Sequence, residues 1–86
     1  AVALASVLAD LAKTHQVIVV THLAQVAVAA DVHYVVRKTQ GDVPETSLSV
    51  VSGEERAFEI ARMLSGDVTE TSLAHAREML HNASSE

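Results

Sequence analysis

Four consecutive β-branched residues, the run Val17–Val20, limit the possible folds of this chain more than any other feature. Apolar character that is continuous rather than alternating is typical of a strand buried on both faces of a parallel sheet. We therefore predict an interior strand over residues 17–20. Thr21 and His22 end the run, and such a strand places its last residues at the carboxyl edge of the sheet, where open α/β folds bind ligands.

His22 is the candidate functional residue at this edge. Its imidazole can donate a hydrogen bond to a phosphate oxygen or a water, and its charge changes near neutral pH. On spacing alone, the simpler interpretation is that His22 ends the strand and bonds a neighbouring carbonyl group. The residues themselves leave both interpretations open.

Hydrophobic periodicity predicts a helix on each side of this strand. Apolar residues recur at i, i+3, i+4 and i+7 from Leu4 to Leu11 and again from Leu23 to Ala30, as on one face of an amphipathic helix. The first helix is expected to end near residues 13–15, because basic side chains suit the negative end of a helix dipole.

A hairpin is predicted after the second helix. Residues 33–38 and 46–51 have the composition of strands, and the second of these segments alternates polar and apolar residues. The intervening Gly41-Asp42-Val43-Pro44 is a strong turn signal, so we expect the two strands to pair antiparallel.

Two helices are predicted at the C-terminal end of the chain. Ser52 and Glu55 match a capping box at the start of the first one, and Gly66 is suited to its end. The second helix is expected to begin within residues 69–71, and residues 82–86 are expected to fray.

The predicted order of elements is α-β-α-β-β-α-α, which makes the chain an α/β unit. The strand and the hairpin lie in residues 1–51, and the C-terminal helices lie in residues 52–86. An interior strand needs neighbours on both edges, and the chain offers at most two others. An uncapped helix at residue 1 also suggests preceding sequence, with removal of an initiator Met as the alternative. We therefore expect residues 1–86 to be one partial domain, the tail of a larger α/β domain.

Composition excludes several classes of protein. The 86 residues contain no Cys, which rules out a disulfide scaffold and a Cys-ligated zinc site. The apolar runs are far shorter than the roughly 20 residues that span a bilayer, and no secretory signal opens the chain. A net charge of −5 argues against binding a nucleic-acid backbone by charge alone. We predict a soluble, cytoplasmic domain that makes no membrane contact.

The string Val-Ile-Val-Val-Thr-His-Leu-x-Gln-Val-Ala, residues 17–27, resembles the switch-histidine segment of the RecN family. This bacterial family consists of SMC-like relatives of the ABC-type ATPases. The opening Ala-Val-Ala-Leu resembles the helix that follows the D-loop in that family. Glu54-Glu55-Arg56, the Ala-Arg-Met-Leu-Ser-Gly string at residues 61–66 and the spaced residues from Thr71 to Leu80 resemble its C-terminal helices. The resemblance covers almost the whole chain.

The resemblance implies the C-terminal part of a P-loop ABC/SMC-type ATPase head that acts in DNA double-strand break repair and recombination. In that family two heads enclose ATP, and His22 matches the switch histidine at the γ-phosphate, with Thr21 beside it. ATP and Mg²⁺ are thus the implied cofactors of the longer protein. The implied partners are the rest of the head and a second head in a homodimer, with DNA bound through other segments and the protein associated with the nucleoid.

Two neighbours of His22 need comment. Gln25 lies one helical turn further on, and the family assigns it no role. Ala24 stands where the family usually has Pro, a residue that preorganises the first turn of a helix. We expect this departure to loosen the loop that aims His22.

The motifs that bind and hydrolyse a nucleotide are missing from the sequence. A P-loop needs clustered glycines and a Lys around the phosphates, whereas Gly41, Gly53 and Gly66 are isolated. The predicted strand ends in Thr-His rather than Asp-Glu, so it is not a Walker B strand, and the ABC signature is also absent. We predict that these 86 residues alone neither bind ATP tightly nor hydrolyse it.

Other residue groups favour structural roles. Glu54-Glu55 suits the positive end of a helix dipole, and Arg37-Lys38 is too small a basic patch for nucleic acid. Two pairs have metal-ligand chemistry but lack a third ligand: Asp31 with His33, and His75 with Glu78. The alternative to an ATPase segment is a stand-alone, non-catalytic protein-interaction module derived from an ATPase domain.

Overall fold

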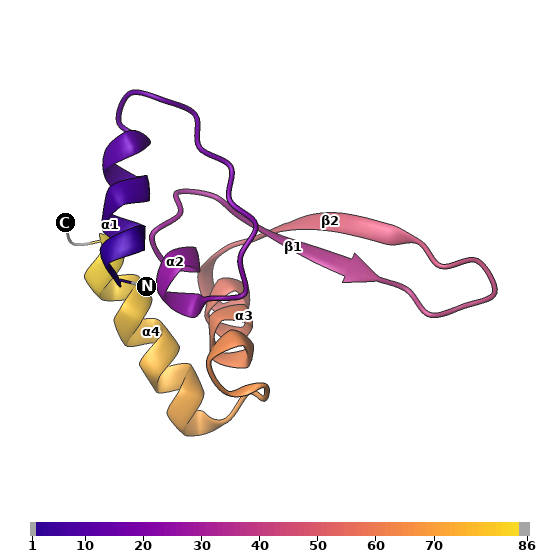
Figure 1. Ribbon diagram of the computed structural model, residues 1–86. Coiled ribbons are helices and arrows are strands. Elements are labelled where there is room, and N and C mark those ends of the chain that lie inside the picture. The colour runs from indigo at the N-terminus through magenta and orange to yellow at the C-terminus, as the bar shows by residue number, and fades with distance from the viewer. Residues whose placement is uncertain (1, 85–86) are drawn as a thin grey trace.

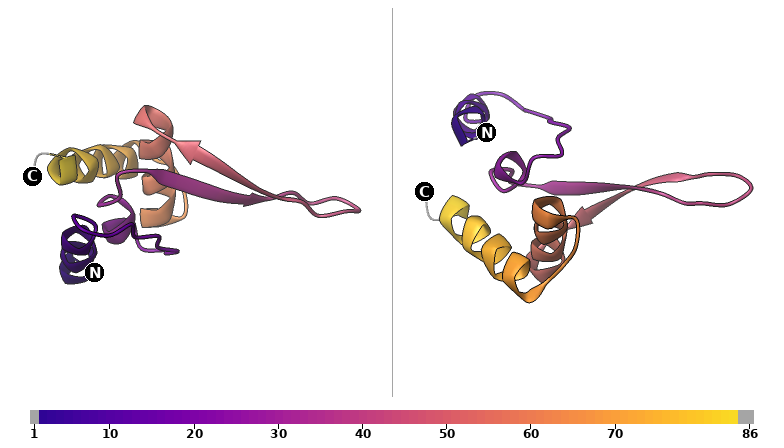
Figure 2. Two further views of the ribbon diagram at one scale, coloured as in Figure 1. Left: turned by 90° about the horizontal axis from the view of Figure 1, so that it is seen from above. Right: turned by 60° about the horizontal axis from the view of Figure 1, so that its bottom comes forward.

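The computed structural model describes residues 2–84, which form a group of helices with a projecting hairpin (Figure 1). The elements are α1 (Val2–Leu11), α2 (Ala24–Ala27), β1 (His33–Lys38), β2 (Thr46–Val51), α3 (Gly53–Ser65) and α4 (Glu70–Ser84). All four helices lie at one end of the molecule, and the hairpin extends away from them in each view (Figure 2). The chain is thus a mixed α/β unit, as predicted.

The prediction of a strand over residues 17–20 is wrong, because the structure has no strand in this segment. This segment lies in the connection between α1 and α2 and pairs with nothing, because the sheet within the described range contains only β1 and β2. Ile18 is 86% exposed and Val20 is 97% exposed. A strand needs hydrogen-bonding neighbours, and β propensity alone does not supply them. The observed order is therefore α-α-β-β-α-α.

The hairpin matches its prediction in both bounds and direction. β1 and β2 pair antiparallel, with Tyr34 opposite Val50 and Val36 opposite Leu48. At the end nearest the helices, Val51 is only 2% exposed and anchors the hairpin to the core. Val35 of β1 is also buried, and the hairpin beyond these two residues projects into solvent.

The core lies where α2, α3 and α4 meet. Ile60 of α3 is its largest fully buried side chain. The other members are small or flexible, which lets the helices approach closely. The buried cluster consists of Ala24, Ala27, Val28, Ile60, Ala61, Ala76 and Met79.

The first helix contributes little to this core. α1 spans Val2–Leu11, and the predicted end near residues 13–15 is a helical turn in which His15 N–H bonds Leu11 O. Ala5 is buried, but Leu4 and Leu11 of the predicted apolar face are largely exposed. The amphipathic pattern was recognised correctly, yet residues 2–84 do not cover that face.

The ends of α3 and α4 follow the sequence only in part. Gly66 ends α3 in the left-handed conformation as predicted, with φ of 77°. The capping box at Ser52 is wrong, because that side chain makes no cap bond. Thr69 caps α4 instead: Ser72 N–H donates to Thr69 Oγ1 at 3.0 Å, and Thr69 N–H donates to Ser72 Oγ at 2.8 Å. Glu54 and Glu55 lie in the first turn of α3, as predicted, and Glu54 also bonds Arg77.

The prediction of a frayed C-terminus is also wrong within the described range. α4 stays helical through Ser84, so residues 82–84 belong to a regular helix. Residues 85–86, like the predicted helix start at residue 1, lie outside the described residues. The apolar stripe of α4 holds its last turn against the core, since Leu80 and Ala83 pack on the buried cluster.

Candidate functional site

Thr21 and His22 lie in the loop that connects the β-branched run to α2. The Thr21 hydroxyl accepts a hydrogen bond from Leu23 N–H at 3.0 Å, which closes a tight turn around His22. The His22 side chain is exposed, and no hydrogen bond or ion pair from it is found within residues 2–84. The alternative that His22 bonds a neighbouring carbonyl is therefore not supported.

The helix that follows this loop is too short to be stable by itself. α2 has four residues, and Leu23 at its N-cap offers no side-chain bond. Its position comes from burial, because Ala24, Val26 and Ala27 are all covered by the core. Ala24 thus holds the start of α2 by packing, where the family's Pro would act through backbone rigidity. Gln25 on the same helix is exposed.

Arg56 holds the other end of α2. Its Nη2 donates to the carbonyl oxygens of Ala27 at 3.0 Å and Ala30 at 2.9 Å. Burial lowers the pKa of Arg56, against a smaller opposing effect of Asp31, yet a guanidinium stays charged at neutral pH. A cation at a helix C-terminus satisfies carbonyl groups and opposes the negative end of the dipole. Sequence reasoning placed Arg56 only within a family string and missed this contact.

His33 lies close to this contact, at the start of β1. Burial lowers its pKa, the positive charge of Arg56 lowers it further, and Glu59 acts in the opposite direction. The Nδ1 atom is buried and has no hydrogen-bond partner among the described residues. Burial and Arg56 thus both disfavour the protonated imidazole, and His33 belongs to the structural surroundings of Arg56.

No family model matches the chain, but curated relatives do. It is 52% identical over 81 residues to the DNA repair protein RecN of Deinococcus radiodurans, and 47% identical over 79 residues to that of Mycobacterium tuberculosis. The RecN of Streptomyces coelicolor is 47% identical over 81 residues. These matches cover 92–93% of this chain. The chain corresponds to a C-terminal segment of RecN.

This RecN segment spans 14% of the length of each of those relatives. Within residues 2–84, no helix is long and apolar enough to cross a membrane. The name DNA repair protein RecN describes those longer relatives.

Within residues 2–84 of the RecN segment, the candidate metal-ligand pairs gain no third ligand and the glycines stay isolated. Within residues 2–84 there is no group of three or more His, Asp or Glu that could hold a metal ion. The Asp31–His33 and His75–Glu78 pairs therefore have no third ligand in this range. Each of the three glycines lies in open space, and none belongs to a phosphate-binding loop. The exposed imidazole of His22 can supply one hydrogen bond or one proton.

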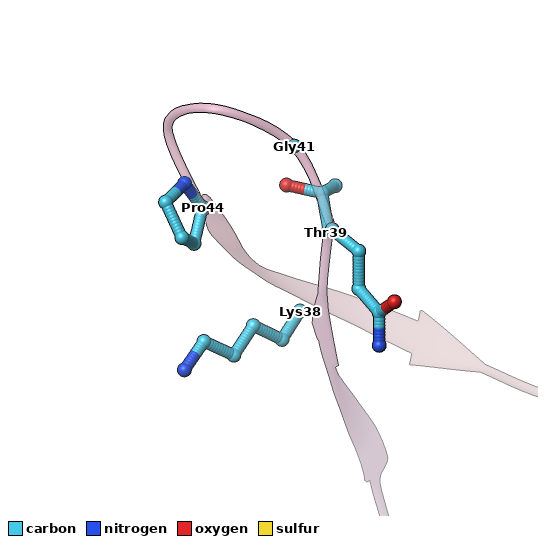
Figure 3. A pocket seen from close by; sticks show the side chains of 5 residues that line it. Lys38, Thr39, Gly41 and Pro44 are labelled. Carbon is cyan, nitrogen blue, oxygen red and sulfur yellow. The ribbon is translucent and has the colours of Figure 1, made fainter.

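Two surface pockets lie away from His22. The larger, about 370 Å³, is at the hairpin tip (Figure 3) and is lined by Lys38, Thr39, Gln40, Gly41 and Pro44. The second, about 220 Å³, lies between α2, α3 and α4, and Arg56 forms part of its wall. The site at His22 is instead an exposed edge, which needs a second surface to become a pocket.

Proposed function

We propose that this segment completes the ATP site of a RecN-type DNA repair protein by supplying His22. The observation that carries the proposal is the exposed imidazole, which has no partner among residues 2–84 and lies between the turn at Thr21 and a helix anchored in the core. The match to DNA repair proteins named RecN supports a contribution to DNA repair.

His22 would act on the terminal phosphate of ATP bound mainly by other parts of the protein. Its ring can donate a hydrogen bond to a γ-phosphate oxygen, or hold the water that attacks it. Thr21 fixes the turn through the bond to Leu23 and keeps its own O–H available for a second contact. ATP and Mg²⁺ supply the reactive phosphoryl group and its charge neutralisation when bound. Head engagement with a second copy would then depend on the state of the nucleotide.

The exposed run before Thr21 supports assembly into a larger head. Ile18 and Val20 lie open to solvent although their side chains favour a buried strand. Leu4 and Leu11 of α1 present a second uncovered apolar surface. We assign both surfaces to contacts with the rest of the head, which carries the P-loop and the metal-binding acid, while DNA is bound outside this segment.

A hybrid protein tests the proposal: this chain replaces the matching segment of the Deinococcus radiodurans RecN. His22→Ala is expected to lower kcat for ATP hydrolysis by about 100-fold, because one group that positions a proton or water contributes on that scale. Binding of a non-hydrolysable ATP analogue should change less than threefold.

The matched control is His75→Ala, which removes an exposed histidine from α4 and is expected to keep full turnover. Equal loss of binding and turnover in His22→Ala would contradict the proposal. So would unchanged turnover in that variant, or an unaltered hybrid that binds ATP and never hydrolyses it.

An interaction module without catalysis is the second candidate, and the hairpin favours it. One face of the hairpin carries the neighbouring pairs Tyr34–Val50 and Val36–Leu48, all of them exposed. Such an apolar face suits a protein contact. The coding sequence before Ala1 separates the candidates: a continuous frame with a P-loop and a long coiled coil supports the ATPase, and a Met codon directly before Ala1 supports the module.

A further inference from the structure

Arg56 connects two parts of the molecule that the sequence separates by more than 25 residues. The guanidinium comes from the first turn of α3, whereas both carbonyl groups that it bonds belong to the C-terminal end of α2 and the turn after it. At the other end of α2, Leu23 N–H donates to the Thr21 hydroxyl, and this bond closes the turn that contains His22. The chain of contacts is therefore continuous from α3 to the switch histidine.

We propose that Arg56 is a positioning residue that sets the orientation of His22 by holding the C-terminal end of α2. This role rests on the function proposed above. A four-residue helix without a side-chain N-cap has little intrinsic rigidity, so its tertiary contacts decide where it points. The packing of Ala24 and Ala27 holds α2 on the core, and the Arg56 bonds add directional contacts at its C-terminal end.

The surroundings of Arg56 show that its conformation is constrained. Its Nε is buried without a partner among the described residues, so the head group is held by its Nη2 bonds and by packing. α3 starts two residues after Val51, the buried end of the hairpin. Glu54 lies two residues before Arg56 and accepts a hydrogen bond from α4. Arg77 Nε donates to Glu54 Oε1 at 3.0 Å. The first turn of α3, which carries Arg56, is thus held by the buried end of the hairpin and by the bond to α4.

The test compares arginines of one helix in the hybrid protein. Arg56→Met removes both bonds to α2, whereas Arg62→Met removes an arginine whose bond is to Glu59 within α3. We expect Arg56→Met to lower kcat at least tenfold with the affinity for the ATP analogue kept within threefold, because small misplacement of a reacting group can cost as much as about 100-fold. Arg62→Met should keep turnover within twofold of the unaltered hybrid.

A double variant distinguishes positioning from general damage. If Arg56 acts through His22, then Arg56→Met adds no further loss to His22→Ala, and the two effects are not multiplicative. Arg56→Lys keeps the charge and one donor direction, so it should recover part of the turnover lost in Arg56→Met. Multiplicative losses, or equal losses in Arg56→Met and Arg62→Met, would overturn the proposal.

Hydrogen exchange supplies a readout that does not depend on catalysis. The amide of Ala27 bonds Leu23 O at 3.1 Å and that of Val28 bonds Ala24 O at 3.0 Å, and both should exchange at least tenfold faster in Arg56→Met only. Unchanged exchange in Arg56→Met refutes the role of Arg56. A different result separates the two proposals: faster exchange in Arg56→Met together with full turnover in His22→Ala. It would refute the function proposed for His22 and leave the contact between Arg56 and α2 established.

Discussion

Glu59 and Arg62 form an ion pair one turn apart on α3 in which the carboxylate is almost completely buried and the guanidinium is largely exposed. Arg62 Nε lies 3.2 Å from Glu59 Oε2, and this bond raises the pKa of Arg62. The exposed guanidinium of Arg62 therefore pairs with the buried carboxylate of Glu59.

Loss of Arg62 should cost more than loss of both partners. Arg62→Met leaves a buried carboxylate unsatisfied, and we expect the free energy of unfolding to fall by about 1–3 kcal/mol. Adding Glu59→Gln to the same chain should restore part of this loss, because a neutral amide is cheaper to bury. Urea denaturation of the three proteins checks the order, and a double variant less stable than Arg62→Met would contradict it.

Ile60 is expected to be the most sensitive apolar position. It is fully buried in the core cluster, so Ile60→Ala should lower the free energy of unfolding by about 2–5 kcal/mol, enough to unfold a chain of this size. Phe58→Ala is the control on the same helix, since Phe58 is largely exposed. Circular dichroism melts should rank Ile60→Ala far below Phe58→Ala; similar melts would place the core elsewhere.

Acidification should destabilise the fold through His33. Its pKa is lowered in the folded state, so the unfolded chain binds a proton more readily and the free energy of unfolding falls as pH drops below about 6.5. The loss ends once pH is below the folded-state pKa. Melting temperatures between pH 7.5 and 5 should decline less in His33→Gln than in the original chain. His75→Gln is the control, because His75 is an exposed residue of α4. An equal decline in both variants would contradict the role given to His33.

The sequence predicted those elements that local patterns determine. The hairpin, the short helix after His22, and Gly66 at the end of α3 all follow from periodicity and turn chemistry. The prediction of a strand over residues 17–20 was wrong because a strand needs neighbouring strands to pair with. A β-branched run shows a preference for the extended conformation, but it does not show whether a partner strand is present. The cap of α4 was missed because Ser72 takes the place of the usual Glu or Gln.

The candidate site was predicted as a position but not as an arrangement. The abrupt end of the β-branched run located Thr21 and His22, and the structure places them in one tight turn. The Arg56 bonds to α2 span 26 and 29 residues, and no local pattern encodes a contact of that separation. The roles of His22 and Thr21 toward a nucleotide stay predictions.

Charging the exposed run should leave the isolated chain intact. Ile18→Lys and Val20→Lys alter side chains in solvent, so the free energy of unfolding should change by less than about 0.5 kcal/mol. The same substitutions should prevent a stable hybrid, because they would bury a charge in the contact proposed between this run and the rest of the head. Analytical ultracentrifugation and thermal melts check both parts, and a hybrid that tolerates Val20→Lys would show that the run stays exposed.

ATP should not bind the isolated chain. One exposed imidazole cannot replace a phosphate loop and a metal, so calorimetry with Mg²⁺ and an ATP analogue is expected to give no heat of binding up to millimolar nucleotide. Micromolar binding that His22→Ala abolishes would mean that these residues hold a complete site.

The exposed run Val17–Val20 also bears on the order of events during synthesis. Domains form from the N-terminal side as the chain leaves the ribosome, so a C-terminal segment emerges after the residues it must join. An uncharged β-branched tetrapeptide that waited for its partners would be prone to aggregate. On the function proposed above, late synthesis lets the run meet a surface of the head that has already folded.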